Sequence, residues 1–495
     1  MTERLRRWAL PALTIASLIG AGVAFDLTGA LPLYRAAIHR TPSLLPSTIV
    51  MAPEEVARGV STVSLYVPFE ELNGEGTGIL RYRIRHGPSW ERFGWVSFFE
   101  NGKLIFSGGV GVRVHGGGSR KTENPQSFRL FFRRRYGLQQ LPAGVAFGGE
   151  HDHPLKRLIL HNDSRPWLTE DFRFHFVNPL GYDIARALGN ITPATRPVRF
   201  YLNGHFDGVY VLTEHFDAKD WFNDHVGRHA SMADDDLDQL WRDVLAVKPL
   251  RMREVAKLLD LDNMTRWYIA AIFSDNRDAY QGPGQFMDRG RTGPPWIWVT
   301  WDVDQSFREP EHDILPMLLE IPGQPRRGRR ENEPRPYVFT TLLAEDPEYR
   351  EYFKRLWVDA MNYVLTPSFL QERASFYEER ARTLGVTDVA YQPVIRKFFA
   401  ERPAALRAMI APAVQSPPMV RVHVSARGHA ITSDGHPIPD EWDGYFFRGQ
   451  TVSLQVPVAA HSAFRAWRLN GRDVPGTTLD LRVDRDATVD AEWIE

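Results

Sequence analysis

The chain has no cysteine among its 495 residues. That absence excludes disulfide bonds, thiolate metal sites and cysteine nucleophiles. The histidines lack the His-Glu-x-x-His spacing of zinc proteases, and no serine, histidine and acid arrangement typical of a hydrolase is legible. The formal net charge is only −1, so no excess of charge favours nucleic acid or an anionic membrane surface as a partner.

Long apolar runs are also scarce, and the one of interest opens the chain. Arg4, Arg6 and Arg7 precede an uncharged, largely apolar stretch from Trp8 to Phe25, about 18 residues and so at the lower limit for a spanning helix. The basic flank predicts that the bulk of the chain lies outside the cytoplasm. We expect residues 1–30 to be a signal anchor, with a cleaved signal peptide and a buried helix as alternatives. The protein is then membrane-anchored and extracytoplasmic, in the periplasm or at the cell surface, or is secreted if the segment is cleaved.

Residues 31–60 carry scattered prolines and read as a linker, after which the pattern becomes strand-like. Apolar residues alternate around the turn Asn101-Gly102 and again around Asn203-Gly204, which predicts two β-hairpins. Between them, apolar residues recur every fourth position from Leu168 to Leu188 and predict a helix. Pro179 lies inside that stretch and predicts a kink or a break into two helices.

Two acidic clusters flank a further predicted hairpin. Ser274-Asp275-Asn276-Arg277-Asp278 ends a predicted helix around Met264 to Ile272, for which Asp262 or Asn263 is the expected N-cap. Trp301-Asp302-Val303-Asp304 follows the apolar run Trp296-Ile297-Trp298-Val299. Pairing across the intervening turn brings the clusters together, and convergent carboxylates with an amide nearby are ligands for Mg²⁺ against phosphates. The alternative is two solvated acidic turns.

Helical periodicity dominates the segments 347–363, 367–382 and 389–410. The pattern therefore predicts an α+β fold of two lobes, with a β-rich N-lobe and a helical C-lobe, in the manner of an atypical protein kinase. Prolines near 412–418 precede short alternating runs with Gly and Pro turns, so residues 420–495 are expected to form a small all-β domain, used as a spacer or adhesive module.

Several phrases in this order resemble the spore-coat-protein-H (CotH) kinase-like family over about residues 61–412. They are Thr77-Gly78-Ile79-Leu80, Trp90-Glu91-Arg92, Val112-Arg113-Val114-His115-Gly116-Gly117-Gly118-Ser119-Arg120, Ser127-Phe128-Arg129-Leu130, Asn162-Asp163-Ser164, Tyr201-Leu202-Asn203-Gly204 and the acidic hairpin. Residues 420–495 look like a bacterial surface-repeat domain through Gly444-Tyr445-Phe446, Phe464-x-x-Trp467 and Ala487-Thr488-Val489-x-Ala491.

The family resemblance implies an atypical kinase that uses ATP and Mg²⁺ to phosphorylate a hydroxyl of an unidentified protein substrate. Asp302 is then expected to bridge the phosphates through the metal, and Asp304 to hold a second ion. Asp278 is expected to orient or deprotonate the acceptor, with Asp275 and Asn276 able to exchange roles with it. Asn276 and Gln285 would add amide oxygens to the metal.

The same resemblance assigns phosphate contacts to the glycine-rich turn. Gly117, Ser119 and Arg120 would approach phosphate closely, and Arg113, Arg129 and Arg133 could add charge or be ordinary arginines at the edge of a core. Glu214 resembles the hinge position that frames a purine, with a surface carboxylate beside Lys219 as the alternative.

Two residues depart from the family pattern. Gln126 stands where the family usually has a phosphate-binding lysine, and Gln285 where it tends to have an asparagine. Alternatives to an active kinase are therefore a weak or inactive kinase-like surface or coat scaffold with a cell-surface partner on its C-terminal domain, and a metal-stabilised binding protein or hydrolase that uses the same carboxylates.

Overall fold

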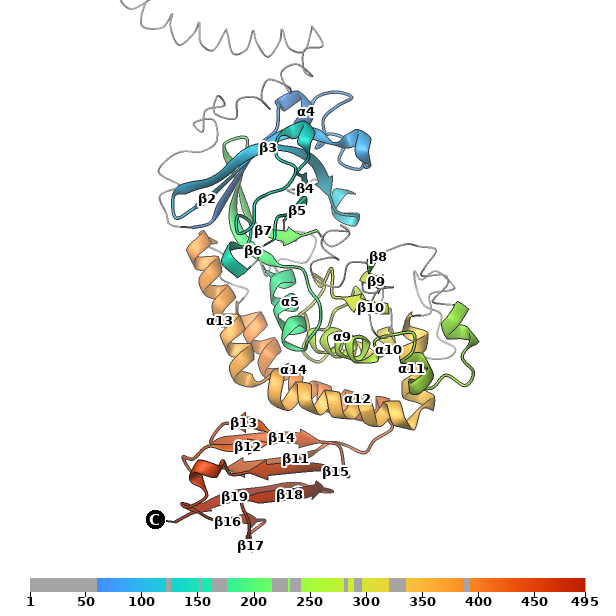
Figure 1. Ribbon diagram of the computed structural model, residues 1–495, viewed down its shortest axis with the longest axis vertical. Coiled ribbons are helices and arrows are strands. Elements are labelled where there is room, and N and C mark those ends of the chain that lie inside the picture. Colours follow the sequence, from blue (N-terminus) through green and yellow to red (C-terminus); the bar gives the residue numbers. More distant parts are fainter. Residues whose placement is uncertain are drawn as a thin grey trace, which may run out of the picture. The chain divides into compact units, whose positions relative to one another are not determined.

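A computed structural model shows that the protein consists of both α-helices and β-sheets (Figure 1). The residues described are 60–121, 126–150, 153–162, 176–215, 230–231, 242–279, 284–288, 296–319, 335–386 and 392–494. They form two compact units. The first takes the described residues up to Asn162 together with Ala194–His215, and the second takes the described residues of Asp163–Pro193 and those from Phe216 onwards.

The first unit is a closed barrel of seven strands, in the order β1-β2-β3-β4-β5-β7-β6. Adjacent strands of the barrel pair in antiparallel fashion, β5 with β7 among them. The exception is β1 and β6, which pair in parallel, from Thr62 opposite Arg199 to Leu65 opposite Leu202, and close the barrel. The strands are β1 (Thr62–Tyr66), β2 (Arg92–Glu100), β3 (Lys103–His115), β4 (Ser127–Phe131), β5 (Arg157–His161), β6 (Thr195–Leu202) and β7 (His205–Glu214).

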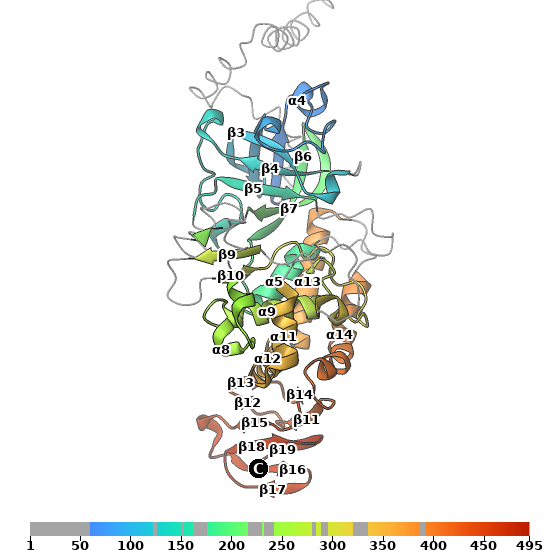
Figure 2. The same ribbon diagram turned by 90° about the vertical axis from the view of Figure 1, so that its right-hand side faces the viewer.

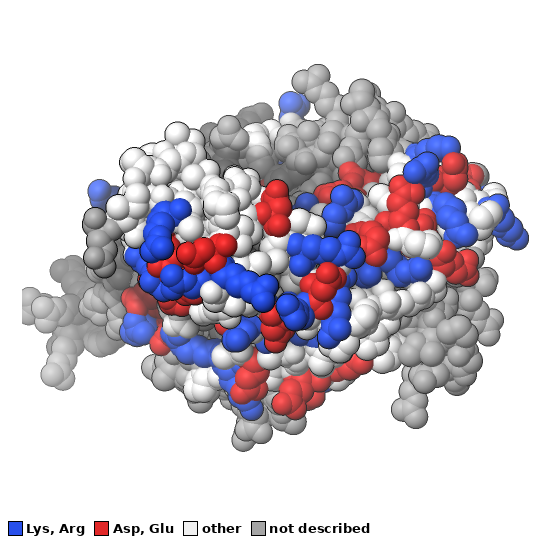
Figure 3. Space-filling view, turned by 90° about the horizontal axis from the view of Figure 1, so that it is seen from below, with Lys and Arg blue, Asp and Glu red and all other residues white. Residues whose placement is uncertain are grey.

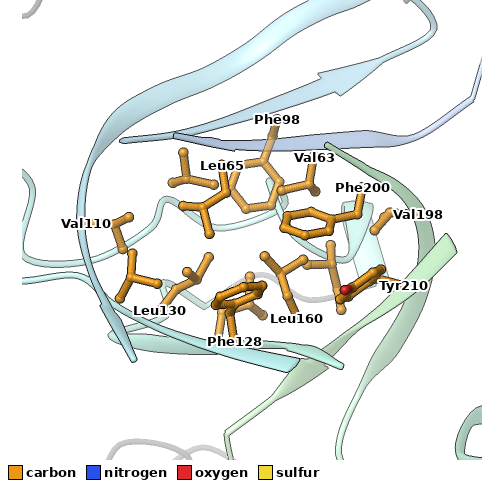
Figure 4. Close-up of a cluster of buried hydrophobic side chains, with 14 of the residues drawn as sticks. Val63, Leu65, Phe98, Val110, Phe128, Leu130, Leu160, Val198, Phe200 and Tyr210 are labelled. Atoms are coloured by element: carbon orange, nitrogen blue, oxygen red, sulfur yellow. The ribbon is translucent and has the colours of Figure 1, made fainter. Parts of the chain in front are cut away.

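The barrel interior is filled by every second residue of these strands, as the two-residue period of a strand requires (Figure 4). The labelled residues that converge there are Val63, Leu65, Phe98, Val110, Phe128, Leu130, Leu160, Val198, Phe200 and Tyr210, each at most 2% exposed. Burial of each large apolar side chain contributes about 1.5–3 kcal/mol. This packed core gives the outer residues of β3 and β4 a rigid support.

The two predicted hairpins are both present in the barrel. Asn101 and Gly102 have φ of 50° and 75°, and Asn203 and Gly204 have φ of 52° and 83°. Two successive positive φ angles are those of the tight turn that suits the right-handed twist of paired strands.

The second unit contains the principal helices, which are α5 (Val177–Ala187), α9 (Leu261–Ser274), α11 (Arg335–Glu345), α12 (Pro347–Asp359), α13 (Pro367–Leu384) and α14 (Gln392–Ala413). Shorter helices are α8 (Met252–Val255) and α10 (Leu315–Leu318), and a small sheet joins β8 (Ala230–Ser231), β9 (Gly284–Asp288) and β10 (Trp296–Val299). Figure 2 shows α5 and α9 among these helices.

Three findings about the helices add to the sequence expectations or correct them. The first is that α5 lies against α9 and α13 in the helical unit, although its neighbours in sequence, β5 and β6, belong to the barrel. The second is that Pro179 is in the first turn of α5, where a missing N–H breaks no helical hydrogen bond. Residues 163–175 lie outside the described ranges, so the predicted kink or break into two helices stays a prediction. The third is that the N-cap of α9 is Asp260, whose carboxylate accepts from the Asn263 N–H at 3.1 Å.

The second unit ends in two stacked sheets. One has the order β14-β11-β19-β16-β17 and the other β13-β12-β15-β18. The strands are β11 (Val420–Ser425), β12 (Ile431–Ser433), β13 (His436–Ile438), β14 (Glu441–Phe446), β15 (Gln450–Gln455), β16 (Phe464–Leu469), β17 (Arg472–Val474), β18 (Thr478–Val483) and β19 (Ala487–Trp493). Buried and exposed residues alternate along β11, as in a strand with one face on a core.

This all-β part is attached to the helices by specific contacts. After α12 the chain makes one π-helical turn, Ala360–Val364, which carries Asn362 and Tyr363. The Asn362 amide donates to the Tyr445 carbonyl at 3.1 Å and accepts from the Tyr445 N–H at 3.0 Å. The Tyr363 ring stacks on His436 with ring centroids 4.4 Å apart. Its hydroxyl shares a hydrogen bond of 2.8 Å with the Ser433 hydroxyl. The all-β part is therefore docked on the helices, which a simple spacer does not require.

Charges of both signs are interspersed on the face of the molecule seen in Figure 3. Strand residues of the all-β part form ion pairs across the sheet, such as Arg421 with Asp443 at 3.8 Å and Arg468 with Glu492 at 2.9 Å. Such a surface offers no field of one sign to attract a polyanion.

Within the described ranges, no helix is long and apolar enough to cross a membrane. The predicted signal segment, residues 1–30, lies outside those ranges.

Replacement of Asn362 by alanine leaves two Tyr445 backbone groups without their partner. Because an unsatisfied buried polar group costs about 1–3 kcal/mol, we expect unfolding of the all-β part to become easier by about 2–4 kcal/mol. Thermal unfolding and limited proteolysis near residue 415 measure this. Arg355→Ala, an exposed change on α12, serves as the control and should stay within about 0.5 kcal/mol of wild type. Equal behaviour of the two variants would show that this asparagine does not hold the all-β part.

Candidate functional site

A cationic cavity of about 250 Å³ lies on the barrel beside the end of β3. Its lining residues include four arginines and two histidines but no acidic residue among those described. They are Ile79, Arg85, His86, Gly87, Trp90, Arg113, Val114, His115, Gly116, Arg120 and Arg129. Arg113 on β3 stands directly opposite Arg129 on β4. Like charges opposite each other destabilise a sheet. The Glu91 carboxylate, 2.6 Å from Arg113, offsets part of that repulsion, and an anion in the cavity would offset more of it.

The predicted glycine-rich turn forms one wall of the cavity. β3 ends at His115, and a 3₁₀ turn from Gly118 to Lys121 follows. Gly116 has a φ of 112°, and a Cβ there would meet the Ser119 Oγ at 2.1 Å, so glycine is required at that position. A Cβ at Gly117 would meet no described atom within 4 Å, so Gly117 faces open space.

Arg120 reaches the cavity from this turn. Its Nε is buried and makes no hydrogen bond to any described group. A buried guanidinium nitrogen without an acceptor is costly, and a phosphate oxygen is a suitable acceptor for it. The residues present therefore fit a phosphorylated ligand.

Arg129 and His115 form a second contact in the cavity. An Arg129 Nη nitrogen lies 3.0 Å from His115 Nδ1, which accepts from it. Burial first, and then the charges of Arg129, His161 and Arg120, lower the pKa of His115 well below its ordinary value. The imidazole is therefore neutral at pH 7, with its proton on Nε2.

A buried carboxylate, Glu91, anchors the arginines on the outside of this region. Arg113 donates to Glu91 at 2.6 Å, and Tyr136 Oη donates at 3.1 Å. Arg133 and Arg135 complete the ion-pair cluster. Burial alone would raise the pKa of Glu91, but hydrogen bonds from Arg135 and Arg113 and the charge of Arg133 outweigh it and leave the pKa below its ordinary value.

Glu214 ends β7 as a fully buried residue. Its carboxylate accepts from the Ala194 N–H at 2.8 Å and lies 3.2 Å from His153 Nε2. The alternative of a surface carboxylate is therefore wrong, and Lys219 lies outside the described ranges. The expected contact with a purine stays a prediction.

In the second unit, the predicted acidic hairpin is present. β9 and β10 pair with Gly284 opposite Val299 and Met287 opposite Trp296. Gln285 lies on β9, and its side chain is not among those that the structure describes. Asn263 of α9 accepts from the Trp298 N–H at 2.6 Å and donates to the Trp298 carbonyl at 3.0 Å, which fixes the helix to β10.

The two acidic clusters lie side by side. The Phe307 N–H donates to the Ser274 carbonyl at 2.8 Å, and the Arg277 N–H donates to the Gln305 carbonyl at 3.3 Å. These bonds connect the end of α9 to the segment that follows β10. The prediction that the hairpin brings the two acidic clusters together is therefore confirmed for the backbone of these segments.

Within the first cluster, Asp275 is not available for exchange of roles with Asp278. It is fully buried, has a φ of 53° and ends α9 in the left-handed conformation. Arg277 lies 3.0 Å and His312 Nδ1 2.6 Å from its carboxylate. Asp278 is only half-buried. The Asn276 side chain accepts from the Asp278 N–H at 3.1 Å, so a metal on Asn276 would compete with this bond, and that ligand stays a prediction.

In the second cluster, Asp302 is exposed with a φ of 52°, while Asp304 is 7% exposed. The Asp302 N–H donates to Tyr182 Oη at 3.3 Å, and the Val303 N–H donates to the Asn178 side chain at 3.0 Å. Both donors are therefore held by α5.

Among the residues described, no group of three His, Asp or Glu side chains is spaced to hold a metal alone. Magnesium seldom needs such a group, because it usually keeps water and takes one or two carboxylates together with substrate phosphates. Asp302 and Asp304 fit that donor set, and a protein-only metal site gains no support.

Sequence reasoning missed several residues of these regions. Arg85, His86 and Trp90 line the cavity, and Glu91 binds one of its arginines, Arg113. Of these residues, only the segment Trp90-Glu91-Arg92 was singled out from the sequence. A charged residue directly before a strand is the one signal for Glu91. Gln126 is buried at 7% exposure, and the cavity charge comes from arginines.

The comparisons with known proteins agree with a kinase-like protein. Residues 112–233 and 222–410 match the family described as CotH kinase protein. The matched segments span more than half of the chain, so the chain belongs to this family.

The structural and curated comparisons add little to the family match. The crystal structure of a Helicobacter pylori proinflammatory kinase CtkA is similar with 10% identity and a TM-score of 0.28, over 61% of this chain and 93% of that chain. Nothing about the site follows from a likeness of this size. The comparison with curated proteins gave no match.

Glu91→Gln should alter the acid stability of the barrel. Because the folded pKa of Glu91 is lowered, its carboxylate stabilises the fold above its ordinary value of 4.5, and this stability is lost as pH falls through the folded pKa. We expect the variant to unfold at lower temperature at pH 7 and the difference to narrow between about pH 5 and 3. Glu75→Gln, at an exposed site, should match wild type at pH 7 to within about 0.5 kcal/mol. A difference for Glu91→Gln that is independent of pH would contradict this account.

Proposed function

We propose that this kinase-like protein is an extracytoplasmic, membrane-anchored phosphotransferase that moves the γ-phosphoryl group of ATP to a protein hydroxyl. The observation that carries the proposal is the cavity beside β3, where Arg120 and Arg129 lie next to the Glu91-paired Arg113. No acidic lining residue is described there, and the Arg120 Nε makes no hydrogen bond to a described group. Phosphoryl transfer depends mainly on positioning and charge stabilisation, and arginines supply both.

In this proposal each unit has its own task. Arg120 and Arg129 would bind the phosphate oxygens of the nucleotide, and neutral His115 would donate from Nε2. Asp302 and Asp304 of the second unit would hold Mg²⁺, which when bound supplies positive charge for phosphoryl transfer. Asp278, half-buried and next to the fixed Asp275, would orient the acceptor hydroxyl. Arginine charge thus stands in for the lysine that Gln126 replaces.

The transfer reaction is tested with labelled ATP, Mg²⁺ and a mixture of acceptor proteins. We expect wild type to transfer phosphate and Asp302→Asn to lower kcat by about 100-fold or more, as loss of a group that stabilises transition-state charge does. Asp262→Asn, an exposed change on α9, serves as the control. Absence of both transfer and a nucleotide-dependent thermal shift in wild type would refute the proposal.

The nucleotide cavity has its own test. Arg120→Ala removes a charged hydrogen bond worth about 1.5–3 kcal/mol, so ATP affinity should fall at least roughly tenfold in calorimetric titration. Arg81→Ala, an exposed change outside the cavity, should leave affinity unchanged. If both variants bind ATP as wild type does, the cavity is not the phosphate site.

A second candidate is a catalytically weak scaffold whose all-β part binds a cell-surface partner. The observation that favours it is the buried Gln126 in place of lysine, together with the docked all-β part. In that case Asp302→Ala and Asp278→Ala would leave the cellular phenotype intact, whereas substitutions on the exposed sheet of the all-β part would abolish it.

A further inference from the structure

One arginine of the second unit, Arg402 on α14, is completely buried. Its guanidinium lies 5.6 Å from the centre of the Phe398 ring. Buried arginines are rare because removal of the charge from water is costly unless every donor is satisfied. The hydrogen-bond partners of Arg402 therefore indicate its structural role.

Among the residues described, its hydrogen-bond acceptors are backbone carbonyls, and they come from two separate segments. Nε donates to Phe273 at 3.1 Å and one Nη to Ile272 at 2.6 Å, both in the last turn of α9. The other Nη donates to Pro310 at 2.9 Å and to His312 at 2.7 Å. One planar fork thus spans the end of α9 and the segment after β10.

These two segments are the ones that carry the acidic clusters. α9 ends directly before Asp275, Asn276 and Asp278, and the other segment leads from Asp302 and Asp304 to Pro310 and His312. Arg402 contacts the backbone of these two segments, so its effect on Asp302 and Asp278 passes through the backbone.

The local electrostatics favour a permanent cation at this point. Burial lowers the pKa of Arg402 to about 10, and Asp275 and Asp313 oppose that shift. The side chain is therefore charged at pH 7. The last carbonyls of α9 carry the negative end of the helix dipole, which a cation stabilises. A lysine at the same site would offer one nitrogen instead of a fork with two arms.

We propose that Arg402 is a positioning residue that sets the spacing between Asp278 on one segment and Asp302 and Asp304 on the other. The inference rests on the proposed phosphotransfer function. A displacement of about 1 Å in such a set can reduce a rate by about 100-fold, since the groups act only when aligned.

The test compares Arg402→Lys with Arg407→Lys in the full-length protein. Arg407 is on the same helix and stacks on Tyr445 at 3.8 Å, so the same change there also disturbs packing but not the acidic segments. We expect Arg402→Lys to stay folded and to lower kcat by about 10- to 100-fold with the KM for ATP within twofold. Arg402→Met should lower kcat further, and Arg407→Lys should leave it unchanged.

Amide hydrogen exchange supplies a readout that does not need activity. In Arg402→Lys it should rise at residues 275–279 and 302–312 and not in the barrel. Unchanged kcat and unchanged exchange there, or equal effects from Arg407→Lys, overturn the inference. If wild type transfers no phosphate, the proposed function fails, and exchange alone then decides whether Arg402 fixes the two segments.

Discussion

Burial of α9 is the constraint on which the second unit depends. Twelve of its 14 residues are buried, so the backbone groups at its C-terminus must find partners inside the protein. They do so through the left-handed residue Asp275, the Phe307 N–H and the Arg402 guanidinium. Each of these partners also holds part of the acidic region. The arrangement of the carboxylates is thus a by-product of the way in which one buried helix end is satisfied.

The first unit has to accommodate several arginines close together on one part of the barrel. Its core supports β3 and β4, whose outward side chains include Arg113 and Arg129 opposite each other. The Glu91 carboxylate pairs with Arg113, Arg133 and Arg135, so these three positive charges lie close together without destabilising the barrel. A region this basic on a chain of nearly neutral net charge would not have been found from composition.

Local signals in the sequence predicted local structure well. Asn-Gly turns, alternating apolar residues and the run Trp296–Val299 identified the hairpins, and helical periodicity identified α9, α12, α13 and α14. The expectations that failed depended on distant contacts. α5 packs on α9 and α13 and not with the strands that flank it in sequence, and Arg402 donates to carbonyls 90 or more positions away. The pairing of β1 with β6, which closes the barrel, has no local signal either. Asp302 and Asp304 were named from their place after the predicted hairpin and from the family resemblance, whereas His115 and Glu91 needed the three-dimensional arrangement.

Closure of the barrel has a consequence for recognition. A closed sheet has no row of free N–H and C=O groups along an edge, so it cannot lengthen itself with a strand from another protein. Any protein that contacts this unit must therefore be recognised by side chains and loops. An extended peptide cannot add to the barrel as an eighth strand. Selectivity for a binding partner would therefore depend on surface side chains and not on the peptide backbone.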